Sequence, residues 1–142
     1  MTPAADEAAR TWWDAARAGT LLLQRCTRCE TLQQPPGPLC RSCGSPDDLD
    51  WTDGDGHGHV VAATRVHTTT YPHLKDALPY WVAVIALRDG ARIVSNLVAV
   101  PDDTTLADGQ CASLTFVQGP NGALPVFRLD PADCGARGGA GA

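Results

Sequence analysis

Two cysteine pairs with identical spacing carry the clearest chemical signal in this sequence. Two residues separate Cys26 from Cys29, and two residues likewise separate Cys40 from Cys43. The segment Gln-Gln-Pro-Pro-Gly-Pro between the pairs is typical of a loop. Four thiolates around one tetrahedral ion form a closed structural site, with no position left for water or substrate. The spacing therefore predicts a structural zinc ion, with iron in the same cage as the less favoured alternative.

Disulfides and a redox Cys-x-x-Cys are the competing interpretations of these pairs. The first residues, Met-Thr-Pro-Ala-Ala-Asp-Glu, lack the basic and apolar regions of a signal peptide, and no apolar run is long enough to span a membrane. We therefore expect a cytoplasmic protein, in which a reducing environment favours metal ligation over disulfides. Two pairs at this spacing also argue against a redox motif.

The size and charge of the chain limit its function. Its 142 residues suffice for one ordinary domain or two small ones, and its formal net charge is −5. Nucleic-acid binding depends on Lys and Arg that neutralise phosphates, and residues 53–130 hold five basic against eight acidic residues. This balance disfavours a nucleic-acid partner, and an anionic membrane surface equally.

The sequence divides into four parts. We expect a helix over residues 1–19, a metal ribbon over 20–52, a β-barrel over 53–130 and a disordered tail over 131–142, which is rich in Gly and Ala. The helix carries Trp12 and Trp13 side by side. Neighbouring helix positions point about 100° apart, so one tryptophan should pack on its own chain and the other is a candidate for partner contact.

The barrel is predicted from five short strands with glycine-rich turns, at residues 57–66, 81–87, 91–100, 111–118 and 125–129. This mainly β pattern, without an intervening long helix, fits a five-stranded OB-fold barrel, with a five-stranded sandwich as the structural alternative. The run 81–87 is wholly apolar, which predicts burial on both faces. Gly58 is expected to mark a bulge or bend in the first strand.

The segment between the first two barrel strands is unusually apolar and rich in proline. In OB folds this connection often binds ligands or partners, and the alternative is a lid over one barrel end. The candidate contact residues here are Tyr71, Pro72, His73, Leu74, Pro79 and Tyr80.

We find no catalytic constellation in the sequence, and therefore predict no catalytic residues. Nucleophile-elbow, zinc-protease, P-loop and dinucleotide signatures are all missing. His57 and His59 alternate on one strand, with Asp55 as a third candidate ligand. A second metal site there is disfavoured, since tetrahedral sites need three or four ligands of suitable geometry.

Taken as a set, these residues resemble a known family. The carriers are a Trp-containing helix, Leu-Leu-Leu-Gln-Arg before Cys26, Pro-Pro-Gly-Pro-Leu before Cys40, Trp51, Gly-His-Gly-His at 56–59 and Pro-Tyr-Trp at 79–81. Together they are similar to the bacterial and archaeal family that joins a rubredoxin-like zinc ribbon to an OB-fold, long known as a domain of unknown function. One departure is Glu30, which stands where the family's first knuckle usually has Gly, and a non-Gly residue adopts positive φ at some cost.

The resemblance implies a role beside another enzyme. Members of this family assemble with thiolase-fold enzymes that act on acyl-CoA thioesters, some of them aldolases that cleave sterol side chains, and the catalytic residues belong mainly to the thiolase-fold subunit. Some members follow an acyl-CoA hydratase domain, so this chain could be an excised domain. The main hypothesis is thus a non-catalytic accessory subunit that helps to form the partner's acyl-CoA site. The alternatives are a single-stranded nucleic-acid-binding module and a free-standing acyl-CoA binding protein. The sequence does not name the acyl group.

Overall fold

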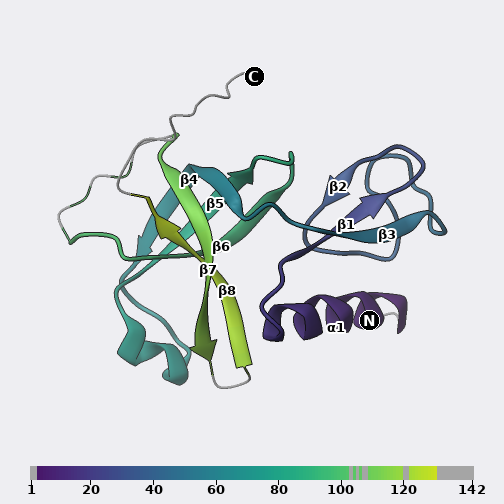
Figure 1. The fold of residues 1–142 in the computed structure, drawn as a ribbon. Helices are drawn as coiled ribbons and strands as arrows, with labels where there is room; N and C mark the ends of the chain where they lie inside the picture. Colours follow the sequence, from purple (N-terminus) through teal and green to yellow (C-terminus); the bar gives the residue numbers. More distant parts are fainter. Residues whose placement is uncertain (1–2, 103, 105, 107–108, 120–121, 131–142) are drawn as a thin grey trace.

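The computed structural model describes residues 3–102, 104, 106, 109–119 and 122–130; the predicted disordered tail at 131–142 lies outside this range. One helix leads into two groups of strands (Figure 1). The elements are α1 (Pro3–Arg17), β1 (Leu22–Cys26), β2 (Leu32–Gln33), β3 (Leu49–Asp53), β4 (His57–Val66), the 3-10 helix η1 (Pro72–Ala77), β5 (Tyr80–Leu87), β6 (Arg92–Val98), β7 (Cys111–Gly119) and β8 (Gly122–Leu129).

The last five strands form the closed barrel expected from the sequence. Their order around the barrel is β4-β5-β6-β8-β7, in which every pairing is antiparallel except that between β6 and β8. That parallel contact is short and pairs Leu97 with Phe127 and Val98 with Arg128. The OB-fold prediction is therefore confirmed and the sandwich alternative is excluded, because a sandwich leaves its sheets open at the edges.

Three details of the barrel differ from the sequence-based expectations. β5 is not buried on both faces, since only Ala83, Ile85 and Leu87 are buried and the residues between them are half-exposed. The last strand begins at Gly122 rather than Pro125. The bulge in β4 lies between Val60 and Ala62, not at Gly58.

Gly58 has a different reason to be glycine. A Cβ added there would lie 2.4 Å from the carbonyl oxygen of Ala86 and 2.9 Å from Cγ2 of Ile85. β4 pairs with β5 and with β7 at this point, so it crosses its neighbour closely enough to exclude any side chain.

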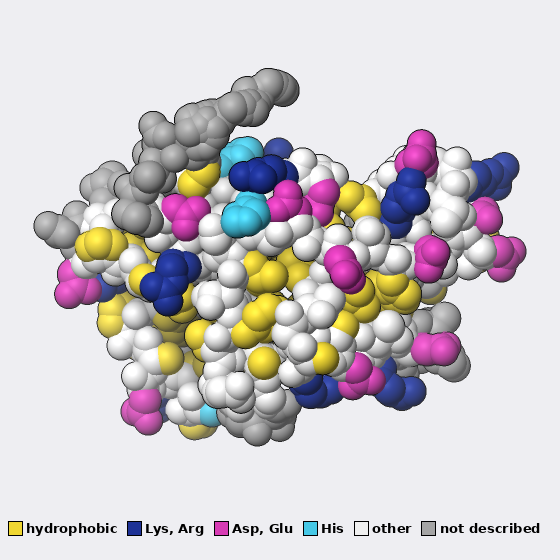
Figure 2. Space-filling view, viewed as in Figure 1, with side chains coloured by type: hydrophobic (Ala, Val, Ile, Leu, Met, Phe, Trp, Pro, Cys, Tyr) yellow, Lys and Arg dark blue, Asp and Glu magenta, His cyan; other side chains and the backbone are white. Residues whose placement is uncertain are grey.

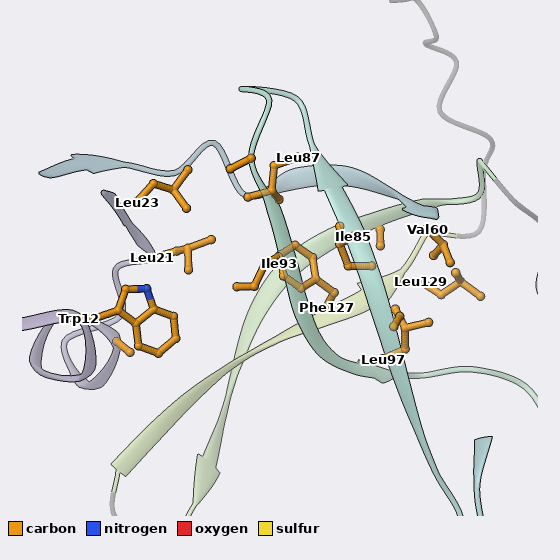
Figure 3. Packing of buried hydrophobic residues seen from close by; sticks show 14 residues of the cluster. Trp12, Leu21, Leu23, Val60, Ile85, Leu87, Ile93, Leu97, Phe127 and Leu129 are labelled. Carbon is orange, nitrogen blue, oxygen red and sulfur yellow. The ribbon is translucent and has the colours of Figure 1, made fainter. Parts of the chain in front are cut away.

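One hydrophobic cluster joins the helix, the ribbon and the barrel (Figure 3). Trp12 lies over Leu21, and both face the barrel residues Ile93 and Phe127, while Leu23 of β1 is fully buried in the same cluster. The metal ribbon is therefore packed against the barrel rather than being an independent unit. The apolar residues of its first strand belong to the same hydrophobic core as those of the barrel.

Candidate metal centre

The two cysteine pairs sit in two hairpin turns with matching backbone hydrogen bonds. In the first turn, the N–H of Cys26 donates to Thr31 O (2.9 Å) and the N–H of Glu30 donates to Cys26 O (2.8 Å). In the second, the N–H of Cys40 donates to Ser45 O and the N–H of Gly44 donates to Cys40 O, both at 2.9 Å. The repeated spacing in the sequence thus produces two equivalent knuckles that face each other.

Each knuckle closes through a residue with positive φ directly after its second cysteine. Gly44 has φ +79°, and Glu30 has φ 62°. This confirms the expectation that Glu30 occupies a position which suits glycine better. The carboxylate of Glu30 forms an ion pair with Arg25 at 2.7 Å, which offsets part of the backbone cost.

The four sulfur atoms form one compact group. The Sγ atoms of Cys26 and Cys43 are 3.7 Å apart, those of Cys29 and Cys40 are 3.5 Å apart, and all four lie within 4.8 Å of one another. A disulfide would bring two sulfurs to about 2.05 Å. An ideal tetrahedron with metal–sulfur bonds of about 2.3 Å has sulfurs about 3.8 Å apart, so this geometry can hold one metal ion. Among the described residues this is the only close group of three or more metal-type ligands.

Without an ion, the pKa values of Cys29 and Cys40 are lowered and that of Cys43 is raised. Hydrogen bonds to the side chain and backbone of Thr31 lower the pKa of Cys29 to about 6, and the backbone of Cys43 lowers the pKa of Cys40. At Cys43 the Ser45 backbone lowers the pKa, but burial and the neighbouring sulfurs outweigh it and raise the pKa to about 11. A cation at the centre removes this repulsion, because the thiolate is the form that ligates.

A pair of buried glutamines ties the proline-rich loop and the second knuckle to the sheet β2-β1-β3. Nε2 of Gln33 donates to Oε1 of Gln24 (2.7 Å) and to Leu39 O (3.1 Å), and Oε1 of Gln33 accepts from the N–H of Arg41 (3.0 Å). Gln24 in turn donates to Gly37 O at 3.0 Å and accepts from its N–H at 2.8 Å. Sequence analysis missed both glutamines, since nothing in their spacing distinguishes them from surface residues.

The two tryptophans of α1 separate as their spacing predicts. Trp12 is 7% exposed and donates its indole N–H to Leu22 O at 2.9 Å, whereas Trp13 is 40% exposed and stands edge-on to Trp12 at 4.8 Å between ring centroids. Trp12 therefore packs on its own chain, and its position does not support a partner contact. Trp13 is the one of the pair that remains free to meet another protein.

The loop candidates lie on and beside η1. Tyr71 is 61% exposed and its ring is 5.9 Å from that of His73. Pro72, His73 and Pro79 are exposed, and Leu74 and Tyr80 are half-buried. The structure thus brings Tyr71 and His73 together; whether the loop residues contact a partner stays a prediction.

His57 takes part in a polar contact instead of a metal site. Its Nδ1 lies 3.3 Å from Oγ of Ser113, and Ser113 is within 2.9 and 3.1 Å of the two carboxylate oxygens of Asp130. The single hydroxyl proton of Ser113 goes to the carboxylate, so the imidazole is not placed as the base of a nucleophilic serine. Figure 2 shows histidine side chains close to acidic and basic side chains on one face of the molecule.

Cys111 of β7 is half-buried and disulfide-bonded. In the described part of the chain, no helix has the length and apolarity that crossing a membrane requires.

Comparison with known proteins gives a consistent picture. Residues 13–50 match the family described as ChsH2, rubredoxin-like zinc ribbon domain, and residues 51–117 match ChsH2, C-terminal OB-fold domain. A chain of the solved Ltp2-ChsH2(DUF35) aldolase is 36% identical, with a TM-score of 0.76 over 90% of this chain and 98% of that one. A DUF35 protein of unknown function from Sulfolobus solfataricus shares the fold at 13% identity and a TM-score of 0.60.

Two curated proteins are also similar to this chain in sequence. A probable enoyl-CoA hydratase alpha subunit of Thermomonospora curvata is 38% identical over 82% of this chain, which spans only 36% of that relative's length. A DUF35 domain-containing scaffold protein of Methanothermobacter thermautotrophicus is 29% identical over 72% of this chain and 77% of its own length.

Proposed function

The chain belongs to the ChsH2 family of zinc-ribbon and OB-fold proteins, and from this premise we propose that it is a non-catalytic accessory subunit of a thiolase-fold aldolase. In this role it docks on the enzyme and helps to form or stabilise the site for an acyl-CoA substrate, such as a sterol side-chain thioester in steroid and lipid degradation. We place the complex in the cytoplasm.

The observation that carries this proposal is the match to the Ltp2-ChsH2(DUF35) aldolase, which covers 98% of the matched chain. A likeness of that extent includes helix, ribbon and barrel together. The scaffold proteins among its relatives point the same way. The local chemistry agrees, because four thiolates fill a tetrahedral ion's coordination sphere and leave no position for a reacting group.

We further propose that the ion is zinc. Closed four-thiolate sites with two Cys-x-x-Cys knuckles are typical structural zinc sites, and the sulfur geometry fits the tetrahedron that zinc adopts. Binding of such an ion contributes on the order of 10 kcal/mol to folding. The ion therefore fixes the knuckles and the proline-rich loop in the shape that a partner would recognise.

Two exposed aromatic groups are the proposed contact points for the enzyme. Trp13 projects from α1, and Tyr71 stands at the start of η1. Aromatic side chains of this kind supply much of the binding energy at protein interfaces, commonly about 2 kcal/mol or more each.

The test is reconstitution of the full chain with a thiolase-fold aldolase from the same genome. Light scattering after size-exclusion chromatography should reveal a hetero-oligomer, and retro-aldol cleavage of an acyl-CoA substrate should require both proteins. Trp13→Ala and Tyr71→Ala should each weaken assembly by roughly 30-fold, the equivalent of about 2 kcal/mol.

Val94→Ala is the matched control, since Val94 is an apolar residue 68% exposed on β6 and outside the proposed contacts. It should assemble as the wild type does. Failure of the two proteins to associate, or full activity of the enzyme alone, would show that the accessory role is wrong. Cleavage of the thioester substrate by this chain alone would contradict its non-catalytic assignment.

A further inference from the structure

A cleft of about 280 Å³ lies between the metal ribbon and the barrel. One wall is formed by β2 and the second cysteine knuckle, and the other by the turn between β5 and β6, which faces the ribbon in Figure 1. The polar residues that line it include Arg41, Ser42 and Arg92. The cleft adjoins the second knuckle, because Arg41 and Ser42 lie between Cys40 and Cys43 in the sequence, and it does not include the proposed aromatic contacts.

The charge of this cleft is opposite to that of the whole chain. Two guanidinium groups line it, Arg41 from the ribbon and Arg92 from the barrel, and none of its lining residues is acidic, although the chain carries a net charge of −5. Neither arginine takes part in an ion pair within the described part of the molecule. Two acidic residues adjoin the lining residues along the chain and have other partners: Glu30 forms an ion pair with Arg25 at 2.7 Å, and Asp89 accepts a hydrogen bond from the N–H of Asp55 at 3.0 Å.

The polar groups around the arginines complete a set suited to an oxyanion. Ser42 adds a hydroxyl group, and the guanidinium of Arg41 is held by a hydrogen bond to Pro35 O.

We propose that this cleft binds a phosphorylated small molecule, with the phosphate group held by Arg41 of the ribbon and Arg92 of the barrel. Two guanidinium groups from opposite walls match a dianion better than a single carboxylate, and Arg–phosphate contacts are among the stronger hydrogen bonds in proteins. Ligand binding would then bridge ribbon and barrel. This inference does not depend on the proposed function.

The test is a ¹H–¹⁵N NMR titration of the zinc-loaded full chain at constant ionic strength. Inorganic phosphate, glycerol phosphate and acetate are the three probes. Phosphate should produce saturable shifts at the amides of Ser42, Gly90 and Arg92, glycerol phosphate should shift the same amides through its phosphate group, and acetate should bind at least tenfold more weakly than phosphate.

Arg92→Gln should weaken phosphate binding at least tenfold, while Arg92→Lys should recover part of the loss. Arg128→Gln is the matched control, since Arg128 is an exposed arginine of β8 outside the cleft, and it should change the dissociation constant by less than twofold. Arg92 lies on the barrel, so zinc content measured alongside should stay unchanged. Shifts that do not saturate, that spread over the surface arginines, or that survive Arg92→Gln would overturn the proposal, as would tighter binding of acetate than of phosphate.

Discussion

The buried Gln33 amide offers the sharpest test of how the ribbon is held together. Its three hydrogen bonds connect the partner glutamine Gln24, the carbonyl of Leu39 and the N–H of Arg41. The change Gln33→Met keeps the length and approximate volume of the side chain and removes all three bonds. Because Arg41 directly follows the metal ligand Cys40, the change acts on the second knuckle without touching a sulfur.

The expected magnitude follows from the groups left without partners. Oε1 of Gln24 keeps the N–H of Gly37 at 2.8 Å, so its loss is partial. The carbonyl of Leu39 and the N–H of Arg41 lose their side-chain partner, at a cost of about 1–1.5 kcal/mol each for partly buried groups. Folding and metal binding are coupled in such ribbons, so zinc affinity should fall by the same 2–3 kcal/mol, or about 30- to 150-fold.

The assay is competition for zinc with a chromophoric chelator, with urea unfolding of the zinc-loaded protein as a second measurement. Gln34→Met is the matched control, because it makes the same chemical change one residue later, where Oε1 is buried without a partner among the described residues. It should leave affinity unchanged or raise it slightly. Wild-type zinc affinity in Gln33→Met, or an equal loss in Gln34→Met, would refute the reasoning.

Two further predictions follow from the ribbon and the barrel. Glu30→Gly should raise the free energy of unfolding by about 0–1 kcal/mol, because relief of the positive φ exceeds the loss of an exposed ion pair. Glu30→Ala should lower the free energy of unfolding, because it loses the ion pair and keeps a side chain at positive φ. Thermal unfolding of the two variants distinguishes these outcomes. Gly58→Ala should cost about 1–3 kcal/mol because its Cβ would overlap the Ala86 carbonyl, while Gly37→Ala, whose Cβ meets nothing closer than 3.8 Å, should be tolerated; equal melting temperatures for the pair would argue against the close strand crossing.

The parts of this fold that sequence alone predicted are those governed by local periodicity. The alternation of residues in 57–66 and 111–118 gave strands at nearly the observed bounds, and the Arg-Asp-Gly turn after residue 87 marked a hairpin. The cysteine spacing likewise predicted a metal site, because a Cys-x-x-Cys turn brings both of its sulfurs to one side. Trp12 and Trp13 had to diverge for the same kind of reason, since helix geometry separates neighbours by about 100°.

Other features depend on contacts between distant segments. Strand 81–87 looks fully buried in sequence, but its outward face is half-exposed because nothing covers that side of the barrel, as far as the described residues show. Which of the two tryptophans packs against its own chain depends on the position of Leu22, ten residues after Trp12, whose carbonyl accepts the indole hydrogen bond. Glycine is required at position 58 because the carbonyl of Ala86 leaves no room for a side chain. The polar contact of His57 depends on Ser113, which in turn bonds Asp130.

By itself, then, the amino-acid order determined that four sulfurs meet in one compact group, suited to a metal ion, beside a five-stranded barrel, since both results rest on spacings of a few residues. The tertiary structure alone decided how these parts join. The Gln24–Gln33 amide pair, the core cluster that includes both Leu23 and Phe127, and the cleft lined by both Arg41 and Arg92 each depend on contacts that the chain makes only when it folds. Such contacts cannot be predicted from local sequence patterns, because long-range packing leaves no periodic signal in the sequence.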